Sequence, residues 1–365
     1  MRILHIDTGM TVRGGQAQLM MLLRGLRTKG HDQTLACPPT SQLSKAASAE
    51  GFQTLGMDRA YWTAIKTIRP LARTHDIAAA HDSRAQTISF LATAGKRITR
   101  VADRLVAFPP RNRLTHGLKY TRTCEIVIAS SQAVKDVMVR NGVPGGHIEV
   151  IRGGIEFPET LPPRDEARAS MRAKWKLAPD DFVIGHLAAF TPEKGQLDAL
   201  EALSTLLPRH PEIRMILAGD GPLRNDPEIK AKALATQAQL PGYIQPDAEF
   251  YSGLDLFLAN STSEALGLAP LYAMAHEVPV IASNVGGLPE VVGNGGWLIP
   301  PSDPHALAQA IESAIDQTGE RLEAAKRARA HARHFSAAIT VDRTEALYQR
   351  LLSRRMQECG TGTRP

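Results

Sequence analysis

The segment Leu254–Val292 contains the residues best suited to hold a phosphorylated ligand. It reads LDLFLANSTSEALGLAPLYAMAHEVPVIASNVGGLPEVV, and Glu264 in it precedes a Gly-containing turn that opens a helix. A second turn, Gly286-Gly287, follows the next apolar strand. Unpaired N–H groups at a helix start attract phosphate. The spacing therefore predicts a strand-turn-helix pocket in which a carboxylate stands beside the backbone N–H groups of four residues: Ala265, Leu266, Gly267 and Leu268.

A cation stands at a second predicted helix start. In the segment HLAAFTPEKGQLDAL, Lys194 directly precedes Gly195 and the helical spacing that follows. An ammonium group beside free N–H groups suits a diphosphate, above all one whose charge grows as it leaves. We therefore expect Lys194 to contribute to the same phosphate site.

Two polar features mark the first half of the chain. Gly14-Gly15 lies between the first apolar strand and its helix, where a backbone without Cβ lets a ligand approach the helix N-terminus. His81-Asp82 directly follows the buried strand of DIAAAHD. A histidine at a strand end is suited to holding a hydroxyl group or moving a proton. A plain turn and a structural histidine are the alternatives.

Basic residues gather between positions 96 and 122. Residues 1–160 hold 22 Lys and Arg against 12 Asp and Glu, and Asp103 is the single acid within this stretch. Such a cluster attracts anionic partners, including lipid headgroups and phosphorylated glycans, although a solvated helix face is the alternative. Its members are Lys96, Arg97, Arg100, Arg104, Arg111, Arg113, Lys119 and Arg122.

Strand and helix patterns alternate along the chain, which indicates parallel sheets with helices on both faces. Apolar runs predict strands at 3–6, 77–80, 126–129, 182–187 and 213–218, with helices at 16–27, from 132, and at 195–207. Ser130 or Ser131 is suited to capping the helix from 132. Residues 157–165 carry three prolines and read as a linker, and 337–356 reads as a final amphipathic helix.

Composition excludes several classes. A chain of 365 residues favours two soluble domains. Three distant cysteines exclude a disulfide framework and a zinc site, and they indicate a reducing, cytoplasmic setting. No apolar run approaches the roughly 18 residues of a membrane span. Aromatic residues make up 5%, and few interleave with the basic cluster, so nucleic-acid binding is disfavoured.

Nearly the whole chain resembles the family-four glycosyltransferases of the two-Rossmann-domain (GT-B) type. The resemblance rests on TVRGGQAQLMMLLRGLRTKGH, DIAAAHDSRA, the segment from 107 to 157, HLAAFTPEKG, GDGPLR and the stretch from Leu254 to Val292. It implies an α/β GT-B fold of two Rossmann-like domains facing across a cleft. We expect an acceptor-binding domain at 1–163, to which helix 337–356 crosses back, and a donor-binding domain at 164–336.

The resemblance also implies roles for individual residues. Glu264 and His81 would be catalytic or contact the sugars. Tyr272 stands where the family has a second glutamate that grips the ribose, and Ala189 stands where it has an arginine that holds the diphosphate. Arg224 is the candidate to replace that arginine. The implied donor-binding set is Gly15, Lys194, Ala265, Leu266, Gly267, Leu268 and Tyr272, with Gly14, Arg224 and Gly287 as further candidates.

The implied reaction is retaining transfer of a sugar from a nucleotide sugar to a cell-envelope glycan or lipid-linked acceptor, for example a lipopolysaccharide core. No metal or other cofactor is expected, because Lys194 and helix N-termini would offset the diphosphate charge and no Asp-x-Asp motif follows a strand. The basic cluster would bind the acceptor or the inner membrane leaflet. The alternatives are an epimerase or phosphorylase of the same fold and a non-catalytic glycan-binding relative.

Overall fold

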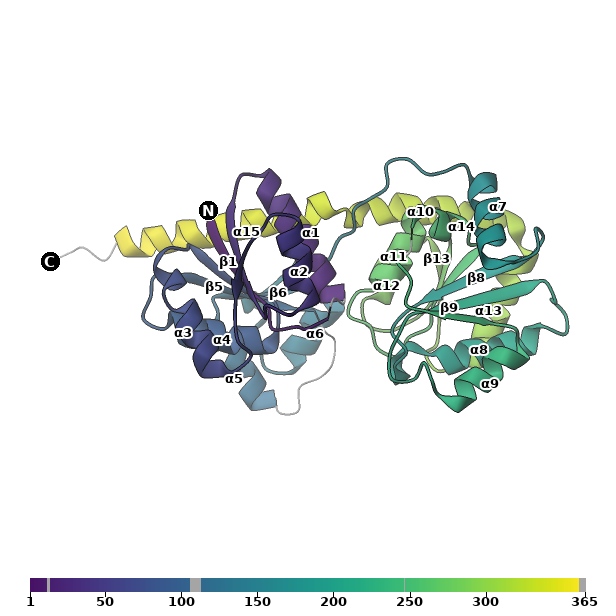
Figure 1. The fold of residues 1–365 in the computed structure, drawn as a ribbon, viewed down its shortest axis with the longest axis horizontal. Helices are drawn as coiled ribbons and strands as arrows, with labels where there is room; N and C mark the ends of the chain where they lie inside the picture. The colour runs from purple at the N-terminus through teal and green to yellow at the C-terminus, as the bar shows by residue number, and fades with distance from the viewer. Residues whose placement is uncertain (12–13, 106–112, 246, 361–365) are drawn as a thin grey trace. The chain divides into compact units, whose positions relative to one another are not determined.

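A computed structural model describes residues 1–11, 14–105, 113–245 and 247–360, with the backbone alone at 113–116 and 358–360. The chain forms two compact units: Met1–Glu156 with the chain from Ala337 on, and Phe157–Ser336 (Figure 1). The predicted boundary after residue 163 is wrong. Phe157 belongs to the second unit because the guanidinium groups of Arg329 and Arg333 lie over its ring, 4.8 and 4.6 Å from the centroid.

The first unit is built on a parallel sheet. Its strands follow the order β3-β2-β1-β4-β5-β6-β7, and every pair of neighbours is parallel. All strands therefore end at the same edge, where polar residues follow β1, β4 and β6. The strands are β1 (Arg2–Ile6), β2 (Asp32–Cys37), β3 (Gln53–Gly56), β4 (Ile77–Ala80), β5 (Thr99–Arg104), β6 (Ile126–Ala129) and β7 (Ile148–Val150).

Helices cover both faces of this sheet because successive strand residues point to opposite sides. Ile3 of β1 packs in a cluster with Leu26 of α1 and Tyr348 of α15, whereas Leu4 packs with Ile68 of α3 on the other face. The last helix is thus part of the first unit's core. The helices are α1 (Gly14–Thr28), α2 (Gln42–Ala49), α3 (Tyr61–Ile68), α4 (Ser83–Thr93), α5 (Arg113–Thr123), α6 (Gln132–Arg140) and α15 (Ala337–Gly360).

The second unit repeats the plan with the strand order β10-β9-β8-β11-β12-β13, again parallel throughout. Its strands are β8 (Phe182–Leu187), β9 (Ile213–Ala218), β10 (Gln239–Gly242), β11 (Leu256–Ala259), β12 (Val280–Ser283) and β13 (Gly296–Ile299). Its helices are α7 (Arg164–Trp175), α8 (Gln196–Leu206), α9 (Pro227–Ala235), α10 (Ala248–Ser252), α11 (Leu268–Ala275), α12 (Leu288–Val292), α13 (Pro304–Asp316) and α14 (Thr318–Ala332).

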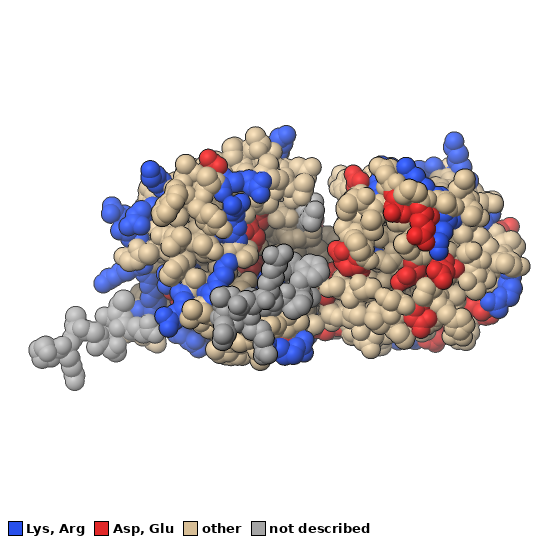
Figure 2. Space-filling model, turned by 90° about the horizontal axis from the view of Figure 1, so that it is seen from below, with Lys and Arg blue, Asp and Glu red and all other residues tan. Residues whose placement is uncertain are grey.

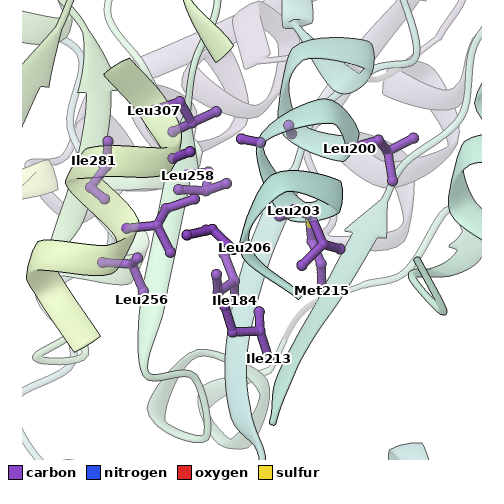
Figure 3. Packing of buried hydrophobic residues seen from close by; sticks show 14 of the residues in the cluster. Ile184, Leu200, Leu203, Leu206, Ile213, Met215, Leu256, Leu258, Ile281 and Leu307 are labelled. Atoms are coloured by element: carbon purple, nitrogen blue, oxygen red, sulfur yellow. The ribbon is translucent and has the colours of Figure 1, made fainter. Parts of the chain in front are cut away.

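The main core of the second unit lies between its central strands and α8 (Figure 3). Leu203 and Leu206 of α8 and Ile184 of β8 are completely buried there. Truncating one such leucine to alanine would destabilise the unit by roughly 2–5 kcal/mol. This packing holds the carboxyl ends of β8 and β11, and the loops that follow them, in fixed positions.

None of the helices in the described ranges combines the length and the apolarity that a membrane crossing requires.

Candidate functional site

The carboxyl edge of the second sheet brings the predicted phosphate-binding residues together. Lys194 follows β8, Arg224 follows β9, Glu264 follows β11 and Gly286 follows β12. These four strands are consecutive neighbours in the sheet. Loops at this edge of an open parallel sheet are where such folds bind their ligands.

Lys194 and Glu264 form a direct ion pair. The Nζ atom of Lys194 lies 2.6 Å from Oε2 of Glu264, and the two side chains are 19% and 22% exposed. The other carboxylate oxygen of Glu264 accepts from the N–H of Ala265 at 3.2 Å. Lys194, the predicted diphosphate contact, and Glu264, the predicted sugar contact, are therefore paired with each other in this structure.

Buried side chains that the sequence analysis missed hold the turn that carries Lys194. The ring nitrogen Nε2 of His186 donates to the carbonyl of Lys194 at 3.0 Å. The amide Nδ2 of Asn260 donates to the carbonyl of Gly195 at 2.7 Å. Burial lowers the pKa of His186 to about 4, so its ring is neutral and carries its hydrogen on Nε2. No local motif marks these two residues in the sequence.

The conformation of Gly195 gives this segment a backbone geometry that favours an anion. Residues Pro192–Lys194 form a short 3-10 turn, and Gly195 then adopts the left-handed conformation with φ of 70°. A right-handed residue followed by a left-handed one points successive N–H groups to a common side, which favours an anion. The N-terminus of α8 has no side-chain cap, so its N–H groups are available to a ligand. A Cβ on Gly195 would collide with the carbonyl of Asn260.

The paired glycines after β12 support Glu264. Gly286 has φ of 54°, and a Cβ on it would collide with the carbonyl oxygen of Glu264. The N–H of Gly287 donates to that same oxygen at 3.2 Å. Gly287 was predicted as a possible donor contact, but its N–H is used inside the protein. The structure thus gives this pair a positioning role for the turn from Glu264 to Gly267, which opens α11 without a side-chain cap.

Tyr272 belongs to an aromatic stack. Its ring lies 6.0 Å from that of Tyr251 at an interplanar angle of 20°, and Tyr251 stacks in turn on His276 at 5.2 Å. Tyr251 is buried, and burial together with Tyr272 raises the pKa of its hydroxyl. Ring packing therefore explains an aromatic residue at position 272. Contact between Tyr272 and a ribose stays a prediction.

Arg224 packs toward the sheet edge away from Glu264. A Cβ on Gly242, at the end of β10, would lie 2.7 Å from the Nη2 atom of Arg224. Strand β10 is the neighbour of β9 on the side opposite to β8 and β11. The idea that Arg224 replaces the cation missing at Ala189 stays a prediction, and it requires the side chain to turn.

In the first unit, His81 is bound through both ring nitrogens. Its Nδ1 lies 2.6 Å from Oδ2 of Asp103, and its Nε2 lies 3.0 Å from Nδ1 of His5. The side chain of His81 is 2% exposed. Both ring nitrogens of His81 thus already have partners, and the predicted contact of His81 with a substrate hydroxyl stays a prediction. Asp82 uses its carboxylate to cap α4.

The glycine pair Gly14-Gly15 lies within the first turn of α1 rather than before it. Gly15 lines a small pocket at the carboxyl edge of the first sheet, together with His81 and Asp103. A Cβ on Gly15 would lie 3.1 Å from the side chain of Leu105. Its contact with a donor stays a prediction.

The basic residues between 96 and 122 do not form one patch in the described part of the chain. Lys96 and Arg97 precede β5, whereas Arg104 ends it. A six-residue strand separates its ends by about 16 Å. Arg100 is paired with Glu125, with Nη2 2.9 Å from Oε1.

The remaining members of that stretch add no continuous surface. The Nζ atom of Lys119 donates to the carbonyl and hydroxyl oxygens of Ser83 at 2.6 and 2.7 Å. Arg111 and the side chain of Arg113 lie outside the described residues. On the face that Figure 2 presents, the Lys and Arg side chains of the first unit lie at several separate places. The described members of this set therefore lie at several separate places, and their binding of an anionic partner or a membrane surface stays a prediction.

The fold defines a two-domain α/β protein with a parallel sheet in each domain. Two family models cover most of the chain: "Glycosyltransferase Family 4" matches residues 12–157 and "Glycosyl transferases group 1" matches residues 167–332. The chain belongs to the GT-B glycosyltransferases of the family-four type.

Individual relatives agree with this family. The D-inositol 3-phosphate glycosyltransferase of Corynebacterium glutamicum is 27% identical over 235 residues, which are 61% of this chain and 56% of that protein. The Rhodococcus jostii protein of the same name is 31% identical over 231 residues, 59% of this chain and 50% of that one. The chain thus spans about half the length of the curated relatives it matches.

A solved structure matches over the whole fold. Anabaena HepE in complex with UDP superposes with a TM-score of 0.86 and covers 96% of this chain and 100% of that one, at 20% identity. At this identity the match shows the fold.

Proposed function

We propose that the chain is a retaining glycosyltransferase that binds a nucleotide-sugar donor on its second unit and acts without a metal ion. The observation that carries this proposal is the Lys194–Glu264 ion pair beside two uncapped helix N-termini at one sheet edge. A diphosphate would take Lys194 and the N–H groups near Gly195, and the donor sugar's hydroxyls would donate to Glu264. The fold neighbour HepE was crystallised with UDP and with UDP-glucose, which supports a uridine nucleotide.

The proposed reaction exchanges one bond at the anomeric carbon. The bond from that carbon to the diphosphate breaks, and both electrons leave on the diphosphate oxygen. The acceptor hydroxyl oxygen forms the new bond on the same face, and its proton passes to the nucleoside diphosphate. Lys194 stabilises the charge that grows on the leaving group, which is the task a divalent ion performs in other enzymes.

The proposed acceptor is a cell-envelope glycan or a lipid-linked sugar, bound by the first unit on the cytoplasmic side of the inner membrane. Two relatives are named for a phosphorylated polyol, D-inositol 3-phosphate, which supports an acceptor that carries hydroxyl groups and negative charge. Sedimentation with anionic phospholipid vesicles tests the membrane part. Binding at low salt that disappears at high salt supports it, and an unbound protein at low salt contradicts it.

A thermal-shift screen against UDP, GDP, ADP and CMP sugars tests the donor. A ligand that binds only the folded protein raises its Tm, so the correct nucleotide sugar should stand out from the others. The same donor should then be hydrolysed slowly without acceptor and at an unchanged rate in EDTA. Loss of the reaction in EDTA would contradict metal independence.

Incubation of the donor without acceptor separates the other candidate functions. An epimerase would convert the donor sugar without releasing a nucleoside diphosphate. Ala189 and Tyr272 remove two of the family's polar donor contacts, which is the observation that favours a non-catalytic relative. If no nucleotide sugar and no nucleoside diphosphate binds, the transferase proposal is wrong and the glycan-binding relative is favoured.

A further inference from the structure

A chain of hydrogen bonds runs through the interior of the first unit from α1 to the sheet edge. The Nε2 atom of Gln33 donates to the carbonyl of Leu23 at 3.0 Å, and Oε1 of Gln33 lies 3.2 Å from Nε2 of His5. His5 continues to His81 at 3.0 Å, and His81 to Asp103 at 2.6 Å. His5 is completely buried, and the chain connects residues of β1, β2 and β5 with His81, which directly follows β4.

The direction of every hydrogen in this chain follows from its two ends. The carbonyl of Leu23 only accepts, so Gln33 donates to it and presents its own oxygen to His5. His5 must then donate from Nε2. Because burial keeps the pKa of His5 well below its usual value, its Nδ1 is unprotonated and accepts a hydrogen bond. His81 therefore donates from Nε2.

The other nitrogen of His81 faces the carboxylate of Asp103. Burial opposes a charge on His81, but Asp103 outweighs it and the pKa of His81 is raised. His81 is thus an imidazolium that donates from both nitrogens, and Asp103 is its counter-ion. One oxygen of Asp103, Oδ2, is used in this pair. Its other oxygen, Oδ1, is buried and has no hydrogen-bond partner among the described residues.

A second unpartnered oxygen belongs to the same pocket. Ser131 caps α6 by accepting from Val134, so Ser130 is not needed as a cap. Ser130 is 4% exposed, and its Oγ has no partner in the described structure. Asp103 and Ser130 both line the pocket.

Most of the remaining walls of the pocket are apolar, and Leu22 and Ile128 are among the residues that form them. Thr340 and Thr344 of α15 line it, and their hydroxyl hydrogens are used by the carbonyls of Arg152 and Thr340, which leaves oxygen lone pairs. The cavity volume is about 40 Å³, which is room for roughly three water molecules. A group of one or two carbons with its hydroxyls fits in this volume.

The chemistry of these walls selects a neutral hydroxyl group. A buried carboxylate oxygen without a partner destabilises the protein, and a hydroxyl donor would offset this cost. Ser130 can both donate and accept, so a diol could use it and Asp103 together. A phosphate would meet the Asp103 carboxylate at close range, and the buried Asp7 and the partly buried Asp82 lie near His81 as well, so an anion is disfavoured.

We propose that this pocket is a binding site for a hydroxyl-bearing end of the acceptor, with Oδ1 of Asp103 and Oγ of Ser130 as its polar contacts. The assignment of the ligand to the acceptor rests on the proposed transferase function. The negatively charged part of such an acceptor is then bound outside this pocket. His81 acts as a positioning residue, because it holds the charge and orientation of Asp103 rather than contacting the ligand.

Saturation-transfer NMR with ethylene glycol, the smallest vicinal diol, tests the site in the 365-residue chain. Wild type should transfer saturation to the diol. Ser130→Ala should lower the transfer at least fivefold, because it removes one contact. Asp103→Asn should also lower the transfer at least fivefold. Its amide oxygen can still accept from His81, and its N–H donor then replaces the accepting oxygen Oδ1 in the pocket. Ser89→Ala is the matched control, because Ser89 is 2% exposed, also has an unpartnered Oγ and does not line the pocket.

Two results would overturn the proposal: no transfer to wild type, or transfer to Ser130→Ala equal to wild type. Calorimetry with UDP on the same samples separates this proposal from the proposed function. UDP affinity should be unchanged in all three variants. A wild type that binds ethylene glycol at this pocket but binds no nucleotide would leave the pocket assignment standing and contradict the transferase function.

Discussion

Both units carry charged side chains at the carboxyl edge of their sheet, but these side chains differ in burial and in hydrogen bonding. In the second unit, Lys194 and Glu264 are 19% and 22% exposed, and among the described residues each has one ionic partner, the other. In the first unit, the side chains of His81 and Asp103 are 2% and 11% exposed, and both nitrogens of His81 are bonded. A partly exposed pair is worth at most about 1 kcal/mol. Separating a buried pair costs about 3–5 kcal/mol.

Because of this difference, we expect the two edges to have different roles. A ligand can replace either member of the Lys194–Glu264 pair at little cost, so the second edge is ready to exchange internal contacts for a donor. The His81–Asp103 pair is part of the first unit's structure, and it offers a ligand one oxygen.

Asp103→Asn should have the largest effect, and on stability. Because the buried imidazolium of His81 loses its counter-ion, the free energy of unfolding should fall by about 3 kcal/mol at pH 6. The folded pKa of His81 is raised, so the pair's contribution is complete below the ordinary value of 6.5 and is lost as the pH rises through the raised value. Urea unfolding at pH 6 and pH 9 should therefore show a smaller difference between the variant and wild type at pH 9.

An equal loss of stability at both pH values would mean that His81 is neutral in the folded protein, and the contrast between the two edges would be lost.

Lys194→Ala should act on ligand binding and leave the fold intact. Removing one charge-assisted phosphate contact costs about 1.5–3 kcal/mol, so calorimetry should show UDP binding weakened by about 10- to 100-fold. Lys232→Ala is the matched control, because Lys232 also pairs with glutamates, Glu201 and Glu228, but lies on α9. Equal affinities of the two variants would remove Lys194 from the donor site.

Gly286→Ala tests whether the second edge depends on backbone packing. Its left-handed φ and the carbonyl of Glu264 leave no room for Cβ, so the unfolding free energy should fall by about 1–3 kcal/mol and UDP-glucose binding should weaken. Gly319→Ala has open space and should be neutral within about 0.5 kcal/mol. Normal UDP-glucose binding by Gly286→Ala would show that the glycine does not position Glu264.

Tyr272→Phe should have the smallest effect. The phenyl ring keeps the stack on Tyr251, so nucleotide affinity should stay within about threefold of wild type if packing is the role of residue 272. A tenfold loss would instead indicate that the hydroxyl contacts the ligand. Tyr272→Glu, which restores the family's residue, should strengthen binding only if the ribose lies within its reach.

Patterns confined to short segments were predictable from the sequence. The bounds of β4, β6, β8 and β9 agree with the predicted strands because each is a continuous apolar run. The meeting of Lys194 and Glu264 at one edge was also predictable, since parallel strands end together. The bond between them was not, because it depends on side-chain reach across two loops.

Long-range and geometric features were not predictable. The partners of His81 come from β1 and β5, which no local spacing connects to β4. The basic cluster is compact in the sequence, but an extended strand carries Arg97 and Arg104 to opposite edges of the sheet. Tyr251 and Asn260 have roles that appear only when their neighbours are in place.

Calorimetry of Glu264→Gln with UDP and with UDP-glucose tests most directly whether the Lys194–Glu264 pair is exchanged for the donor. The substitution frees Lys194 and removes a negative charge beside the diphosphate, so UDP should bind several-fold more tightly than to wild type. The same substitution removes the carboxylate for the sugar hydroxyls, so UDP-glucose should lose affinity relative to UDP. Equal weakening of both ligands, or no change in either, would contradict the account.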